Sequence, residues 1–142
     1  MAEPHTLQVD VVSAEGEIFS GLATMVFAPA SQGDIGVAPR HAPLLSMLKP
    51  GEVRVQTPAG EELFFFVGGG AIEVQPHRVT VLADTALRAK DLDEAAALAA
   101  KQRAEEALKD RSSHISQAEA LAELARAAAQ LKLIAKLRKV RG

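Results

Sequence analysis

The chain has 142 residues, a formal net charge of −2 at pH 7 and no cysteine, which fits one domain or one domain with a small appendage. The lack of cysteine excludes disulfides and thiolate metal sites. Because the five phenylalanines are the only aromatic residues, a stacking platform for bases is not expected, and no nucleic-acid partner is predicted.

Proline and glycine divide the chain into two parts. All seven prolines lie at or before Pro76, and after Gly70 the only glycine is the terminal Gly142. Because these residues punctuate strands and are disfavoured inside helices, the first part predicts strands and turns, and the alanine-rich part predicts helices. We therefore expect a body at residues 1–85 and a helical arm at residues 86–142.

Within the body, alternation of apolar and polar residues predicts half-buried strands at residues 7–11, 53–55, 72–74 and 79–81. Turn signals separate the strands at Glu15-Gly16, Ser20-Gly21, Pro50-Gly51, Pro58-Ala59-Gly60 and Gln75-Pro76-His77-Arg78. Short strands at this spacing, roughly 8–12 residues, predict a sandwich or a barrel. The apolar run Leu63–Val67 does not alternate, which predicts a strand buried on both faces.

No motif of the body predicts catalysis, a metal or a cofactor. A strand follows Gly68-Gly69-Gly70, whereas a phosphate loop needs a helix there, so the glycines indicate a bulge or a close backbone approach. The carboxylates Glu61 and Glu62 flank a turn and are interpreted as solvated. The four histidines, His5, His41, His77 and His114, lack metal-ligand spacing.

Neither a membrane span nor a leader is expected. The longest nearly apolar run, Leu63–Ile72, is far below the roughly 20 residues that cross a bilayer. The first five residues have no basic segment and no Arg-rich amphipathic pattern, which argues against a signal or transit peptide. We therefore expect a cytosolic chain, whatever it attaches to.

The arm predicts two helices joined by a short polar segment. Asp91 as N-cap with Glu94 as its capping-box partner opens a helix to about Lys109, and a second capping box, Ser116–Glu119, opens a helix to about Lys139. The short connection predicts an antiparallel hairpin. Its seam is expected at Leu92, Ala96, Ala99 and Ala107 of the first helix and at Leu121, Leu124, Ala125, Ala128, Leu131 and Ala135 of the second.

An alanine seam buries little area, about 0.8 kcal/mol per methylene-sized group, so helix docking is expected to be weak. Helix propensity keeps each helix formed nonetheless. The arm can then rearrange without melting, although a static hairpin is the other interpretation.

Charge follows the same division of the chain. Residues 1–85 carry four basic and ten acidic side chains, whereas residues 86–142 carry twelve basic and eight acidic side chains. The last nineteen residues hold six basic side chains and no acid: Arg126, Lys132, Lys136, Arg138, Lys139 and Arg141. This indicates an acidic partner surface or self-association. The alternative is that cations simply favour the C-terminal end of a helix dipole.

Three segments, Gly33–Leu45, Val67–Val74 and Val79–Asp84, together with the opening Leu7–Ser13, resemble the epsilon subunit family of bacterial F-type ATP synthases. The run Gly-x-x-Gly-x-x-Pro-x-His-x-Pro-Leu is the most specific part. The resemblance extends in order over essentially the whole chain, including the helical tail.

The resemblance implies a ten-stranded β-sandwich followed by an antiparallel α-helical hairpin. It implies a non-catalytic rotor subunit without a cofactor, bound to the gamma subunit and the c-ring, that helps to couple proton flow to ATP synthesis. The subunit would be peripheral, at the cytoplasmic face of the bacterial inner membrane. Its C-terminal helices would extend towards the alpha/beta catalytic head and inhibit ATP hydrolysis, with the six basic tail residues meeting acidic groups.

The resemblance also assigns contact residues. The loop facing the c-ring corresponds to Ser31, Gln32, Gly33, Asp34, Ile35 and Gly36, with Asp34 at the acidic position. The gamma or rotor contacts correspond to His41, Ala42, Pro43 and Leu44. For His41, a hydrogen-bonded turn residue is the alternative interpretation.

Two departures from the family pattern affect these expectations. Arg40 stands where the family usually has glycine, which costs stability if the position needs a positive φ. Some members bind ATP through Ile/Leu-Asp-x-x-Arg-Ala; here Leu92–Ala97 has alanine in place of the arginine. Asp93 and Arg126 remain as nucleotide-binding candidates, and we expect weak or absent ATP binding.

Two other function classes remain open. A stand-alone adaptor would bind one partner through the body and a second through the arm, without co-purifying rotor subunits. An enzyme such as a nucleotide hydrolase would show turnover by the pure chain. Capture of a gamma subunit separates these alternatives from a rotor subunit.

Overall fold

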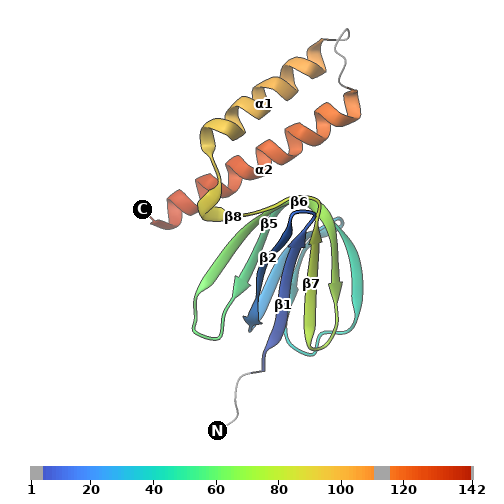
Figure 1. The fold of residues 1–142 in the computed structure, drawn as a ribbon, viewed down its shortest axis with the longest axis vertical. Helices are drawn as coiled ribbons and strands as arrows, with labels where there is room; N and C mark the ends of the chain where they lie inside the picture. Colours follow the sequence, from blue (N-terminus) through green and yellow to red (C-terminus); the bar gives the residue numbers. More distant parts are fainter. Residues whose placement is uncertain (1–4, 111–115, 142) are drawn as a thin grey trace. The chain divides into compact units, whose positions relative to one another are not determined.

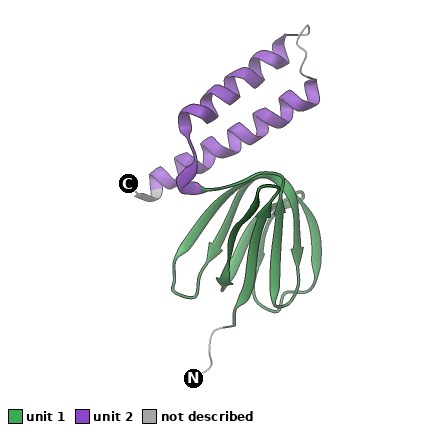
Figure 2. Ribbon diagram, viewed as in Figure 1, with its two compact units in different colours: residues 1–88 green, residues 89–142 purple. Residues whose placement is uncertain are grey.

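A computed structural model describes residues 5–110 and 116–141 (Figure 1). The chain divides into two compact units, Met1–Arg88 and Ala89–Gly142 (Figure 2). The division falls three residues beyond the domain boundary expected from the sequence. The first unit holds the strands and the second holds the helices.

The first unit is a β-sandwich of eight strands in the part of the chain that the structure describes. The strands are β1 Leu7–Ser13, β2 Gly16–Ala23, β3 Met25–Ala30, β4 Gly33–Val37, β5 Leu44–Gln56, β6 Glu62–Val74, β7 Arg78–Ala83 and β8 Ala86–Arg88. Their order is β2-β1-β7-β6-β5-β3-β4, with β8 also on β6. All pairs are antiparallel except β1 with β7. The predicted sandwich is confirmed; eight strands rather than ten are found, with β5 and β6 each continuous over 13 residues.

Two of the predicted turns are wrong, because their glycines serve close packing inside strands. Ser20-Gly21 lies within β2, and Pro50-Gly51 lies within β5. A Cβ atom on Gly21 would lie 2.9 Å from Cζ of Phe19, and one on Gly51 would lie 2.9 Å from Cβ of Pro29. The other three predicted turns do connect strands.

The glycine triplet lies within β6, where this strand changes partners. Residues 65–67 of β6 pair with β8, and residues 70–74 pair with β7. Gly69 and Gly70 have φ of 109° and 130°, and a Cβ on Gly70 would lie 2.1 Å from the carbonyl oxygen of Leu82. The predicted close backbone approach is confirmed, since only glycine fits this geometry.

The core of the sandwich is built from alternate residues of its strands. The predicted inward positions are all buried: Leu7, Val9, Val11, Val53, Val55, Ile72, Val74, Val79 and Val81. The run predicted to be buried on both faces is buried at Phe65–Val67, whereas Leu63 and Phe64 are half-buried.

The second unit contains a 3₁₀ turn, Ala89–Asp91, and two helices, α1 Glu94–Lys109 and α2 Gln117–Arg141. The predicted cap Asp91 is wrong: it lies in the 3₁₀ turn, and Asp93 accepts the N-cap hydrogen bond from Ala96 N at 3.2 Å. The second predicted cap is confirmed, because Ser116 Oγ accepts from Glu119 N at 3.1 Å. Apart from its first residue, the predicted connection 110–114 lies outside the described residues.

The helices pack through an alanine seam, as predicted, but mostly through other residues. The buried residues are Ala97, Ala104 and Ala107 of α1 and Ala120, Ala127 and Leu133 of α2. Of the predicted seam, Ala107 is confirmed, and Leu92, Leu124 and Leu131 are half-buried. Six predicted residues are exposed and were wrongly placed: Ala96, Ala99, Leu121, Ala125, Ala128 and Ala135. Alanines occur all around these helices, so the sequence pattern does not select the buried side.

Candidate docking surfaces

The outer side of the sandwich carries an exposed apolar row that crosses four strands. In the strand register Met47 of β5 lies opposite Ala71 of β6, Ala71 opposite Leu82 of β7, and Leu82 opposite Val12 of β1. Directly opposed residues share a face of the sheet, and Leu45 joins them because it lies two residues before Met47. We call these five residues the apolar row.

Three members of the apolar row are strongly exposed. Leu45 is 72 % exposed, Met47 63 % and Leu82 50 %, whereas Val12 and Ala71 are half-buried. Their chain neighbours, such as Leu48 and Val81, point into the core. A contiguous exposed apolar patch on a rigid sheet marks a surface for another protein.

A polar cluster around Asp10 borders this row. Asp10 is 8 % exposed and accepts hydrogen bonds from Ser20 Oγ at 2.7 Å and Gln8 Nε2 at 3.1 Å, and it pairs with Arg78. The Ser20 hydrogen bond, followed by those from Gln8 and the charge of Arg78, holds the pKa of Asp10 below its usual range, although burial opposes them. The cluster ties β1 to β2 and β7, so it fixes the strands that carry the row.

The predicted rotor contacts form the segment that leads into β5, the strand that carries Leu45 and Met47 of the row, and Leu44 is the first residue of that strand. His41 is half-buried, and Ala42, Pro43 and Leu44 are exposed. His41 N donates to Ala38 O at 3.2 Å, and its Nδ1 lies 2.7 Å from Ala42 O. These bonds are the ones expected of His41 as a hydrogen-bonded turn residue.

Arg40 has a φ of 69°, the left-handed conformation that the family glycine suggested. Its N donates to Pro76 O at 2.8 Å, which ties this loop to the turn between β6 and β7. The sequence predicts that Arg40 costs stability if this position has a positive φ, and the position does have one.

The loop assigned to the c-ring forms the turn between β3 and β4 and most of β4. Ser31, Gln32, Asp34 and Gly36 are exposed, and Gly33 and Ile35 are half-buried. Ser31 N donates to Met47 O at 2.8 Å, so the turn is anchored beside the apolar row. Since β4 pairs only with β3, it forms an edge of the sheet.

In the helical unit, the basic end of α2 faces the start of α1. Arg138 pairs with Glu94, and Lys132, Lys136 and Lys139 are exposed, whereas Arg126 is half-buried. The backbone of Arg141 ends α2, but its side chain lies outside the described part. Arg138 of the tail is thus already engaged within the chain.

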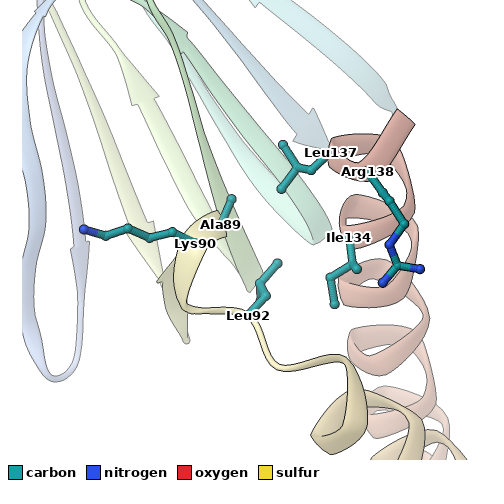
Figure 3. A pocket seen from close by; sticks show the side chains of 6 residues that line it. All are labelled: Ala89, Lys90, Leu92, Ile134, Leu137 and Arg138. Carbon is teal, nitrogen blue, oxygen red and sulfur yellow. The ribbon is translucent and has the colours of Figure 1, made fainter. Parts of the chain in front are cut away.

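A cavity of about 370 Å³ lies at this end of the helical unit, lined by Ala89, Lys90, Leu92, Ile134, Leu137 and Arg138. The side chains of Leu92, Ile134 and Leu137 supply apolar walls (Figure 3). The nucleotide candidates Asp93 and Arg126 are not part of this lining, and Asp93 caps α1. Neither of the two residues assigned to ATP binding therefore lines this cavity.

Among residues 5–110 and 116–141, no group of three or more His, Asp or Glu side chains could hold a metal ion. No helix of that part is long and apolar enough to cross a membrane.

The apolar row was missed at the sequence level. Alternation placed Val79 and Val81 inward, which implies that Leu82 points outward. That signal was available. Alignment with Met47 and Val12 depends on strand register, which the sequence does not reveal.

The fold defines a two-unit protein, a β-sandwich followed by a helical hairpin. The sequence model "ATP synthase, Delta/Epsilon chain, beta-sandwich domain" matches residues 6–89, and "ATP synthase, Delta/Epsilon chain, long alpha-helix domain" matches residues 90–135. The chain belongs to the delta/epsilon family of ATP synthase subunits.

Similar proteins extend over nearly the whole chain. The ATP synthase epsilon chain of Nitrosococcus oceani is 65 % identical over 137 residues, which cover 96 % of this chain and 98 % of that protein. The ATP synthase epsilon chain of Halorhodospira halophila is 60 % identical, covering 94 % and 96 %. The resemblance identified from three motifs is confirmed.

Among solved structures, a chain of the Euglena gracilis mitochondrial ATP synthase OSCP/F1/c-ring assembly has a TM-score of 0.72 at 15 % identity, covering 100 % of this chain and 85 % of that one. A chain of the Tetrahymena thermophila central stalk/c-ring assembly has a TM-score of 0.58 at 14 % identity, covering 96 % and 98 %. These two likenesses establish the fold.

Proposed function

We propose that this chain is the non-catalytic epsilon subunit in the central stalk of an F-type ATP synthase. It binds the gamma subunit and the c-ring, and it helps to couple proton translocation to ATP synthesis. The support is the high identity to epsilon chains over nearly their full length. Its place is peripheral, at the cytoplasmic face of the bacterial inner membrane.

The apolar row is the observation that carries a docking role. Three large apolar side chains of the row are at least half exposed on a sheet that the core holds rigid. When a partner covers these side chains, each Å² of apolar surface removed from water contributes about 25 cal/mol of favourable binding free energy. We assign the gamma subunit to this row, together with the adjoining segment His41–Leu44.

The c-ring is assigned to the loop Ser31–Gly36. Its turn residues are exposed, and Asp34 offers a carboxylate. The hydrogen bond from Ser31 N to Met47 O couples the position of this loop to the apolar row. One rigid sheet thereby presents both contacts.

The arm regulates ATP hydrolysis in this proposal. Exposed cations of the tail, such as Lys132 and Lys139, would meet acidic groups of the alpha/beta head when the hairpin opens. Arg138 would join them after leaving Glu94. Truncation after Arg88 keeps the hydrogen bond from Arg88 Nη2 to Ile18 O at 2.9 Å, so the body stays complete. The truncated subunit should assemble and raise the ATPase rate of the complex; an unchanged rate would contradict an inhibitory arm.

ATP is not a tight ligand in this proposal. Asp93 is engaged as the cap of α1, and alanine stands at the position of the family arginine. Calorimetry on the full chain should show affinity weaker than micromolar, and a micromolar constant would contradict this.

The docking test is capture of the chain by an immobilised gamma subunit. Leu82→Asp places a charge in the row and should weaken binding about tenfold or more, because the carboxylate would be buried without a partner. Leu98→Asp is the matched control, since Leu98 of α1 is 51 % exposed and Leu82 is 50 % exposed. Circular dichroism checks that both variants fold.

If the gamma subunit captured the Leu82→Asp variant and the unsubstituted chain equally well, the apolar row would not be part of the interface. Failure of the unsubstituted chain to bind gamma would contradict the stalk assignment itself and would favour a stand-alone adaptor.

A further inference from the structure

The two methionines of the described chain differ sharply in their surroundings. Met47 is 63 % exposed at the β5 end of the apolar row. Met25 is half-buried, and its Cε packs at 3.2 Å from the position that a Cβ on Gly36 would occupy. Oxidation of methionine follows the access of reagents to sulfur. The thioether of Met47 is therefore the more open to attack.

We propose that Met47 is a modification site, and that its oxidation by a hydroperoxide weakens docking through the apolar row. This inference rests on the proposed docking function. A lone pair of the thioether sulfur attacks one peroxide oxygen, so an S–O bond forms and the O–O bond breaks. Sulfur loses two electrons and the peroxide is reduced. The proton of the attacked oxygen moves to the second oxygen, which leaves as an alcohol, or as water when the oxidant is hydrogen peroxide.

The sulfoxide changes the row because it places a strong acceptor among apolar side chains. Met47 lies two residues after Leu45 on β5, and its register partner Ala71, which is in turn opposite Leu82, offers no side-chain donor. Ser46 Oγ donates to the backbone oxygen of Met47 at 3.1 Å. A polar S=O group covered by a partner without a donor loses its hydration, which should weaken binding about tenfold.

The modification is reversible in principle, since sulfoxide reductases restore the thioether. Met47 is open to peroxide before the row is covered, so oxidation acts on the free subunit. The site would thus make assembly of the stalk sensitive to peroxide without any cysteine in the chain.

The first experiment uses the full chain alone. It is treated with dilute hydrogen peroxide, and peptide mass mapping follows the gain of one oxygen atom at each methionine. Met47 should oxidise several-fold faster than Met25. Equal rates, or faster oxidation of Met25, would overturn the assignment of the site, whether or not gamma binds.

The second experiment measures binding to the gamma subunit before and after peroxide treatment. The treated unsubstituted chain and Met47→Gln, which carries a polar group at this position, should bind about tenfold more weakly. Met47→Leu should bind normally and become insensitive to peroxide, whereas Met25→Leu, the matched control, should remain sensitive.

Unchanged binding after complete oxidation of Met47 would overturn the docking effect. Loss of peroxide sensitivity in Met25→Leu would assign the effect to Met25 and would also overturn the proposal. Absence of binding by the untreated chain would instead disprove the proposed docking function, and with it this consequence of oxidation.

Discussion

The sandwich and the helical hairpin bury different kinds of side chain. The core of the sandwich consists largely of Val, Ile, Leu and Phe, each of which contributes about 1.5–3 kcal/mol when fully buried. The buried seam of the hairpin consists of five alanines and Leu133, and an alanine methyl contributes about 0.8 kcal/mol or less. One chain thus combines a unit whose shape is fixed by side-chain packing with a unit held largely by helix propensity.

Among the substitutions considered for the two units, Gly70→Ala in the sandwich is expected to lower the free energy of unfolding most. The new Cβ would lie 2.1 Å from Leu82 O at a φ of 130°, so β6 and β7 must separate. We expect a loss of more than about 3 kcal/mol in the free energy of unfolding, measured by urea denaturation.

Gly16→Ala is a matched control for Gly70→Ala. Gly16 has nearly the same φ, 129°, but a Cβ there would meet nothing within 4 Å. Gly16→Ala should lower the free energy of unfolding only by the backbone strain, about 1–2 kcal/mol. Equal losses in the two variants would show that φ, rather than the close approach to β7, makes glycine necessary.

The hairpin can be broken by filling its seam. Ala104 is fully buried, so Ala104→Leu should force the helices apart at a cost of about 1–3 kcal/mol while each helix persists. Hydrogen exchange should rise in α1 and α2 and stay unchanged in the core strands. The exposed Ala99→Leu is the control, and similar exchange in both variants would contradict the seam.

The stability of the sandwich should depend on pH through Asp10, which is the buried charged residue among those described. Its folded pKa lies below the unfolded value, so its stabilisation is complete above the unfolded pKa of about 3.9. It is lost as the pH falls through the folded pKa.

Asp10→Asn should therefore destabilise the chain by about 1–3 kcal/mol at pH 7, and the difference from the unsubstituted chain should shrink under acid. Chemical denaturation at pH 7 and at pH 3 measures this. A difference that stays constant between the two would contradict the ionised state of Asp10 as the cause.

The two units also differ in what their sequences reveal. Strand alternation identified the inward residues of the sandwich because a strand has only two faces. It did not reveal that β5 runs through Pro50-Gly51, because that depends on the packing of Pro29 against Gly51. In the helices, alanine occurs on every side, so the pattern located the end of α1 and the start of α2 but misplaced the N-cap of α1 by two residues and did not select the buried face. The apolar row required strand register, which emerges only from the folded sheet.

The smallest effect is expected at Arg40, where the family comparison and the backbone agree. Arg40 has a φ of 69° and its side chain is exposed, so Arg40→Gly should remove the backbone strain without loss of packing. Glycine also gains freedom in the unfolded chain, which offsets part of the benefit. We expect a net stabilisation of about 0.5–1 kcal/mol, seen as a rise in Tm.

The control for Arg40→Gly is Arg40→Ala, which removes the same guanidinium but keeps the Cβ. If Arg40→Ala stabilised the chain as much as Arg40→Gly, the side chain and not the backbone would be the source of strain. A gain confined to glycine would instead mean that even the rigid sandwich stores strain in the loop that ties β5 to the turn between β6 and β7. Strain in a surface loop leaves the core packing of the sandwich intact. The two units would then still differ in the side chains that fill their interiors, even though the sandwich also contains a strained loop.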